Sequence, residues 1–93
     1  MFTAQQFIDN NSDLIATQEK NLTHLIKQHL EANGFYDGEF AAPEGNPLGA
    51  TIVAILNVKR TLDDLGWSLI YKRIKEKPST FSITVFPSTS LFY

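Results

Sequence analysis

Residues 67–86 read WSLIYKRIKEKPSTFSITVF, and this stretch decides the fold. Residues 67–75 and 81–86 are rich in aromatic and β-branched side chains, and the second run alternates between apolar and polar residues. Between them, Pro78 and Ser79 are residues that favour a turn. The stretch therefore predicts an antiparallel β-hairpin with strands at about 67–75 and 81–86.

The length of the hairpin loop determines which side chains face the core, because a register shift of one residue turns every side chain to the other face. A loop at 76–80 pairs Tyr71 with Val85, whereas a loop at 76–79 places Lys72 in the middle of an apolar face. We favour the longer loop for this reason. The second face then carries Ile70, Ile74 and Phe86, which require cover from the tail at 87–93, from a second copy or from a partner. The side chains expected on the core face are Trp67, Leu69, Tyr71, Phe81, Ile83 and Val85.

Upstream of the hairpin, the pattern predicts three helices, at about 4–9, 12–33 and 47–65. Thr3 is a good N-cap for the first helix, and Gly34 is suited to end the second. In the third segment, residues 50–58 are β-branched enough to form a buried strand, and this alternative stays open. Asn46 as N-cap, Pro47 in the first turn and Gly66 after the last turn favour a helix.

The segment at 34–47 holds three Gly and two Pro and predicts a connection without a long regular element. Phe35, Tyr36 and Phe40 could pin such a loop to the rest of the protein. Together these elements give an α+β fold, with helices packed on a C-terminal hairpin. We expect one small domain, 1–93, with a possible C-terminal tail at 87–93.

Composition narrows the possible functions. The chain has 93 residues, a formal net charge of −2 and no Cys, which excludes disulfide scaffolds and thiolate metal sites. No secretory signal and no apolar run of membrane-spanning length is visible, so we expect a cytoplasmic protein without a membrane partner. Residues 1–45 carry a net charge of −5 and residues 46–93 a net charge of +3, an asymmetry that can steer a partner or draw the two halves together.

Groups suited to catalysis or metal binding are few and separated. His24 and His29 are five residues apart on opposite sides of a helix, whereas a helical metal pair needs a spacing of three or four. His29 lies on the apolar face, where we expect a hydrogen-bonded core or half-buried side chain. Asp63 and Asp64 point about 100° apart, and Asp63 can reach Lys59 or Arg60 instead. We predict no catalytic residues, metal ligands or cofactor, and no enzyme activity.

The most concentrated polar feature is the basic hairpin. Its four cations surround the predicted turn and are interleaved with an aromatic side chain, an arrangement that suits an acidic groove or surface. We interpret the chain as a small non-enzymatic protein that regulates or inhibits a macromolecular partner by protein–protein contact. Self-association through the hairpin is a further expectation. The candidate partner-binding residues are Lys72, Arg73, Lys75, Lys77 and Tyr71 of the hairpin, with Phe35, Tyr36 and Phe40 of the aromatic segment.

The alternative is a nucleic-acid-binding protein. The order of helices followed by a basic-tipped hairpin is similar to the winged helix-turn-helix class, and the hairpin would then contact phosphates. Against this alternative, the helix at 47–65 carries Asp63 and Asp64, which phosphates repel, and the whole chain is acidic. The sequence leaves open whether the basic hairpin contacts protein or nucleic acid.

Overall fold

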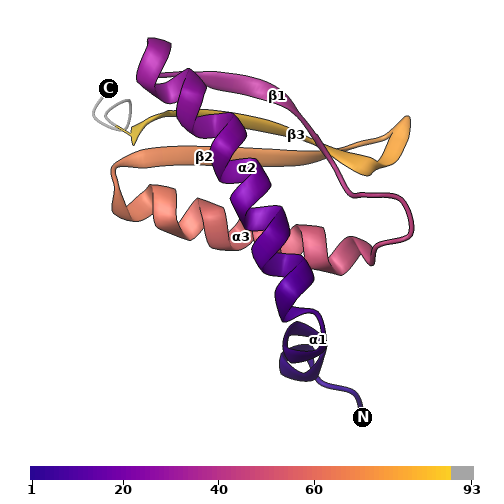
Figure 1. The fold of residues 1–93 in the computed structure, drawn as a ribbon. Helices are drawn as coiled ribbons and strands as arrows, with labels where there is room; N and C mark the ends of the chain where they lie inside the picture. Colours follow the sequence, from indigo (N-terminus) through magenta and orange to yellow (C-terminus); the bar gives the residue numbers. More distant parts are fainter. Residues whose placement is uncertain (89–93) are drawn as a thin grey trace.

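A computed structural model describes residues 1–88 and has an α+β fold. Three helices, α1, α2 and α3, combine with a three-stranded sheet (Figure 1). In chain order the elements are α1 (Ala4–Asn10), α2 (Ser12–Asn33), β1 (Tyr36–Ala41), α3 (Leu48–Asp64), β2 (Trp67–Ile74) and β3 (Lys77–Pro87).

The sheet is antiparallel, and its strand order is β1-β3-β2. The last strand of the sequence is therefore the central one, and β1 and β2 are the two edges. Helices α2 and α3 lie on the same side of the sheet, since both contribute to one core cluster with side chains of all three strands; in Figure 1, α2 crosses in front of the strands and α3 runs below β2. Within residues 1–88 no helix covers the other side.

The helices begin and end close to the capping residues predicted from the sequence. The Thr3 side chain accepts a hydrogen bond from the backbone N–H of Gln6, and the Gln6 side chain accepts one from Thr3, which forms a capping box at α1. Gly34, with φ of 71°, ends α2 in the left-handed conformation. The segment at 50–58 is helical. One detail of the prediction is wrong: the N-cap of α3 is Pro47 and not Asn46, so the helix begins one residue later.

The hairpin has the predicted core face but a different register. Tyr71 pairs with Ile83 instead of Val85, because the turn consists of only Lys75 and Glu76 and β3 already begins at Lys77. An irregularity after Arg73 leaves residues 78–80 without partners in β2. The Arg73 Nε donates to the carbonyl of Pro78 at 2.7 Å within this bulge. From Trp67 to Arg73 the register differs by two residues, so the side chains of this part keep their predicted face.

The prediction of a connection at 34–47 is wrong, because Tyr36–Ala41 forms the edge strand β1. Tyr36 pairs with Val85, and Phe40 pairs with Phe81. Gly38 lies between the two aromatic residues on the core side of the strand, and a Cβ there would approach the Tyr36 Oη to 2.6 Å. The absence of a side chain at Gly38 thus lets the Tyr36 ring lie along β1.

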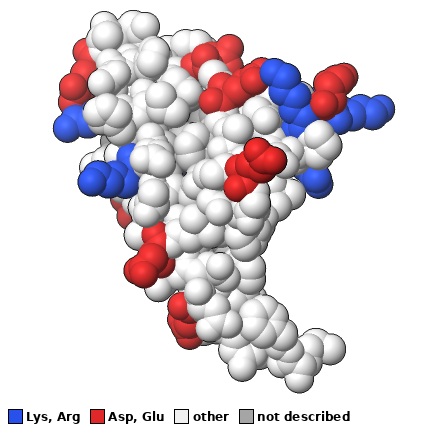
Figure 2. Space-filling view, turned by 45° about the vertical axis from the view of Figure 1, so that its right-hand side comes forward, with Lys and Arg blue, Asp and Glu red and all other residues white. Residues whose placement is uncertain are grey.

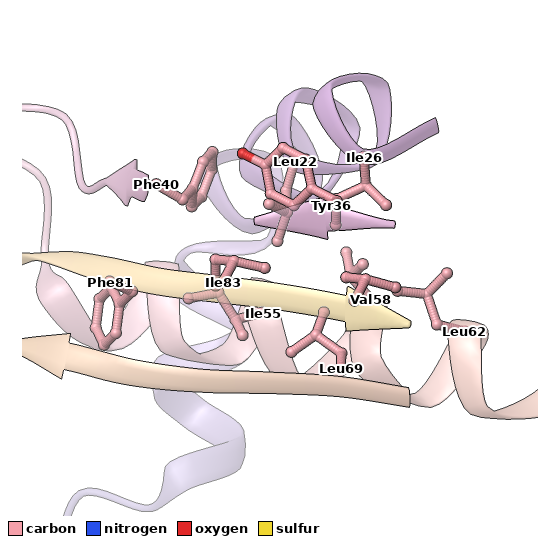
Figure 3. Packing of buried hydrophobic residues seen from close by; sticks show 11 residues of the cluster. Leu22, Ile26, Tyr36, Phe40, Ile55, Val58, Leu62, Leu69, Phe81 and Ile83 are labelled. Carbon is pink, nitrogen blue, oxygen red and sulfur yellow. The ribbon is translucent and has the colours of Figure 1, made fainter. Parts of the chain in front are cut away.

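The main core lies between the two long helices and the sheet (Figure 3). Leu22 and Ile26 of α2 face Tyr36 and Phe40 of β1, while α3 packs over β2. Trp67 is partly buried at one margin of this cluster. The buried members are Leu22, Ile26, Tyr36, Phe40, Ile55, Val58, Leu62, Leu69, Phe81, Ile83 and Val85.

A smaller cluster attaches α1 to the beginning of the two long helices. Ile15 packs with Ala50 and Ala54, and Phe7 and Ile8 of α1 cover them. The Phe7 ring lies where Gly49 leaves room, because a Cβ at Gly49 would come within 3.2 Å of it. No residue of α1 is fully buried, and the helix projects beyond the sheet at the lower end of Figure 1.

No helix among the described residues is long and apolar enough to cross a membrane.

Candidate interaction surfaces

A groove lies between α2 and α3, where the two helices diverge toward their C-terminal ends (Figure 1). Its volume is about 530 Å³. Ile26 and Leu30 of α2 form one wall, and Val58 and Leu62 of α3 form the other. Leu65 and Trp67 line the end at which α3 connects to β2. We call this the α2/α3 groove, and its lining is mainly apolar.

The lining of the α2/α3 groove also includes polar side chains, which we call its rim. Lys27 stands between Glu19 and Glu31 along α2, and Thr61 lies on α3. The Glu19 carboxylate accepts a hydrogen bond from the Asn57 amide at 3.0 Å, which links the two helices. The rim therefore presents both charge signs, and the interior presents hydrocarbon and the Trp67 indole.

At the end of the groove next to β2, which we call its exit, lies an apolar side chain that is largely exposed to solvent. Leu65, which follows the last turn of α3, is 69% exposed. Gly66, with φ of 88°, then turns the chain into β2. Next to this turn, the backbone N–H of Ser88 donates to the carbonyl of Gly66 at 3.0 Å. This backbone hydrogen bond joins the turn after Leu65 to the end of β3, and Leu65 lies at the surface beside it.

The four predicted cations do not form one patch. Arg73 donates within the hairpin bulge, and the Lys77 ammonium is 3.3 Å from the Glu39 carboxylate of β1. Lys72 projects from the sheet face without helices, whereas Lys75 lies in the turn. In Figure 2 the basic side chains at the upper right, where the hairpin tip lies, are mixed with acidic ones.

The aromatic side chains predicted to contact a partner differ in their exposure to solvent. Tyr36 and Phe40 are only 5% and 7% exposed, and both belong to the core. Phe35 is 46% exposed at the entry to β1, and Tyr71 lies at the surface beside the Phe81 ring. Of the predicted aromatic side chains, only Phe35 and Tyr71 can therefore contact a partner without unfolding.

Burial also changes the acidity of one of these groups. Desolvation raises the pKa of the Tyr36 phenol above its ordinary value of 10.0, and the neighbouring Asp37 carboxylate raises this pKa further.

The side of the sheet without helices is the second large surface. We call it the open sheet face, formed by Asp37 and Glu39 of β1, Ser82 and Thr84 of β3, and Ile70 and Lys72 of β2. Ile70 is 57% exposed, and Ile74 and Phe86 are half-buried. The prediction that apolar side chains lie on the second hairpin face is confirmed. Leu91, Phe92 and Tyr93, proposed as their cover, lie outside the described residues.

The titratable groups singled out in the sequence stay apart. The side chain of His29 is exposed instead of buried in the core; its Nδ1 donates to the Leu25 carbonyl at 2.9 Å, and its ring packs edge-on against Tyr36. His29 faces the edge strand β1, so its ring contacts Tyr36 at the margin of the core and stays exposed on its other side. Asp63 pairs with Lys59 at 3.3 Å, as predicted. Among residues 1–88, no three His, Asp or Glu side chains are placed to hold one metal ion.

Sequence reasoning missed the α2/α3 groove because it placed all apolar positions of both helices in one core. Leu65 carried a usable signal, since it extends the apolar stripe of α3 past the last helical turn. The divergence of the two helices, which opens the groove, depends on tertiary packing and has no signature in either helix alone.

Comparisons with known proteins add no relative: no protein-family model, no curated protein sequence and no solved structure matches this chain.

Proposed function

We propose that this chain is a small non-enzymatic binding domain that regulates or inhibits a protein partner by direct contact. The observation that carries the proposal is the α2/α3 groove, an apolar hollow of about 530 Å³ that opens to solvent at Leu65 and Trp67. Exposed apolar concavities of this kind are typical of binding sites. Trp is also one of the residue types enriched among the residues that contribute most binding energy in protein interfaces.

The shape of the groove favours an amphipathic helix as the occupant. Its α2 wall extends from Glu19 to Glu31, which corresponds to about 18 Å, or three turns of a helix. An amphipathic helix of that length places one apolar stripe in a groove and leaves its polar side in water. The mixed charges of the rim, with Lys27 between two glutamates, suit a partner helix that carries both charge signs beside its apolar stripe.

The test compares two exposed leucines, Leu56 of α3 and Leu65 directly after it. Leu65→Asp places a charge at the groove exit, and Leu56→Asp places the same charge at an exposed position outside the groove lining. We expect a protein captured from a host extract by the wild type and by Leu56→Asp to be lost with Leu65→Asp. A segment of that protein should then shift the emission of Trp67, the single Trp of the chain. Equal capture by both variants would contradict the proposal.

The cationic hairpin tip remains a predicted second contact for an acidic protein surface. Arg73→Glu with Lys75→Glu should slow association with the same partner, mainly at low salt, because exposed charges steer encounter more than they hold a complex.

Nucleic-acid binding is the weaker proposal. A helix-turn-helix unit joins two consecutive helices by a short turn, but here β1 separates α2 from α3. Retention on immobilised heparin that falls steeply with salt would favour nucleic-acid binding over the protein partner.

A further inference from the structure

The open sheet face carries an ordered arrangement of charge. The backbone register places Glu39, Ser82 and Lys72 side by side across the three strands, and the next row is Asp37, Thr84 and Ile70. Each row therefore has an acidic side chain on β1 and a hydroxyl in the middle, and β2 contributes Lys72 to the first row and Ile70 to the second. Within one copy, the Lys77 ammonium also lies 3.3 Å from the Glu39 carboxylate. The charges of this face change sign from one edge to the other.

Such a face is complementary to itself in one orientation. If two copies pack face to face about a two-fold axis parallel to the strands, β1 of each copy lies over β2 of the other. Since that rotation preserves position along the strands, Glu39 of one copy comes opposite Lys72 of its partner, and the contact occurs twice. An axis across the strands would place β1 over β1 and bring acid against acid.

We propose that the open sheet face is the interface between two copies of this chain, held by reciprocal pairing of Lys72 with Glu39. The contact covers Ile70, the most exposed apolar side chain of the sheet. It also buries the Asp37 carboxylate, which keeps a partner because the Thr84 hydroxyl donates to it at 3.2 Å. The helices lie on the outside, so the α2/α3 groove of each copy stays open, and the inference does not depend on the proposed function.

The test is an exchange of charges read by sedimentation of the full chain over a range of micromolar concentrations. Lys72→Glu and Glu39→Lys should each weaken dimerisation about tenfold or more, because each change places like charges at two contacts. The double variant restores opposite charges with the direction reversed and should return dimerisation to near the wild-type level. Circular dichroism should show the same fold throughout, since both side chains are exposed.

Two control variants separate this interface from general charge effects. Lys75→Glu makes the same charge change in the hairpin turn and should leave the dimer intact. Lys77→Gln removes the partner of Glu39 within one copy and should leave dimerisation unchanged or stronger.

A chain that stays monomeric at every concentration overturns the proposal. The proposal is also overturned if the wild type dimerises but the double variant does not recover dimerisation. That result would indicate pairing through a sheet edge.

Discussion

At the residue scale, two polar side chains in the core lack partners. The Thr51 Oγ1 of α3 and the Gln18 Oε1 of α2 are buried without a hydrogen bond. A buried hydroxyl that has lost water and gained no partner costs free energy. Neither residue lines the α2/α3 groove.

We expect Thr51→Val to raise the free energy of unfolding by about 1 kcal/mol, because it removes the unpaired hydroxyl and keeps the shape of the side chain. The midpoint of urea unfolding measures this change. Thr61→Val is the matched control on the same helix, since the Thr61 hydroxyl is exposed and donates to the Asn57 carbonyl; it should leave the midpoint nearly unchanged. A lower midpoint for Thr51→Val would show that its hydroxyl has a partner.

Tyr36 makes folding sensitive to high pH. Its pKa in the folded protein is raised above 10.0, so the folded state holds the phenolic proton where the unfolded chain begins to lose it. This contribution to stability is complete below pH 10 and is lost as the pH rises through the folded-state pKa. We expect Tyr36→Phe to lose less stability than the wild type between about pH 10 and pH 12.

The measurement is the urea midpoint at several pH values in that window. Tyr71→Phe, which removes an exposed phenol, is the control and should behave like the wild type. Parallel curves for the wild type and Tyr36→Phe would contradict the assignment to Tyr36.

At the scale of single elements, α1 is attached to the rest of the protein by Phe7 and Ile8, and Phe7 supplies the aromatic contact. We expect Phe7→Ala to release α1 from Gly49 and to speed amide exchange at Ile8 to Asn10, while α2, α3 and the sheet stay folded. The loss should be about 1 to 2 kcal/mol, since the Phe7 side chain is only half-buried. Phe2→Ala, at an exposed position before α1, should change neither quantity. Unchanged exchange in Phe7→Ala would show that α1 is held by other contacts.

The helices and the hairpin were predictable from local signals, but β1 was not. Thr3, Gly34 and Gly66 mark helix ends through their own chemistry, so the boundaries of α1, α2 and α3 were predicted to within one residue. In β1, Asp37, Gly38 and Glu39 are poor strand formers. They form a strand because β3 supplies the hydrogen bonds and the core receives Tyr36 and Phe40.

The same long-range pairing explains the missed register and the burial of two of the predicted binding residues, Tyr36 and Phe40. Pro78 and Ser79 resemble turn residues, yet Ser79 accepts a hydrogen bond from Ala42 beyond the end of β1. A strand that was not predicted therefore extends β3 and shortens the turn. It also moves Tyr36 and Phe40 from the expected binding surface into the core.

At the scale of the whole molecule, the division of charge along the sequence has only a small effect on folding. Two ion pairs occur in residues 1–88, and the one between the acidic and basic halves, Glu39 with Lys77, is largely exposed. Exposed pairs of this kind contribute roughly 0 to 1 kcal/mol. Attraction between the halves is therefore a minor term beside burial of the core.

We expect the free energy of unfolding to change by less than about 1 kcal/mol when NaCl rises from about 0.05 M to about 0.5 M. Dimerisation, if it uses Lys72 and Glu39, should weaken several-fold over the same range. Chemical unfolding and sedimentation in matched buffers test the two effects separately. A large loss of folding stability in salt would show that the charge division holds the fold together.

The strand order also determines when the fold can form during synthesis. Strands β1 and β2 leave the ribosome before β3, the strand that lies between them. Until Lys77–Pro87 has been made, β1 and β2 lack their common partner strand. The apolar sides of α2 and α3 then have no complete sheet to pack against. The nascent chain therefore carries unpaired backbone and exposed core side chains until β3 emerges, and such species are prone to aggregation.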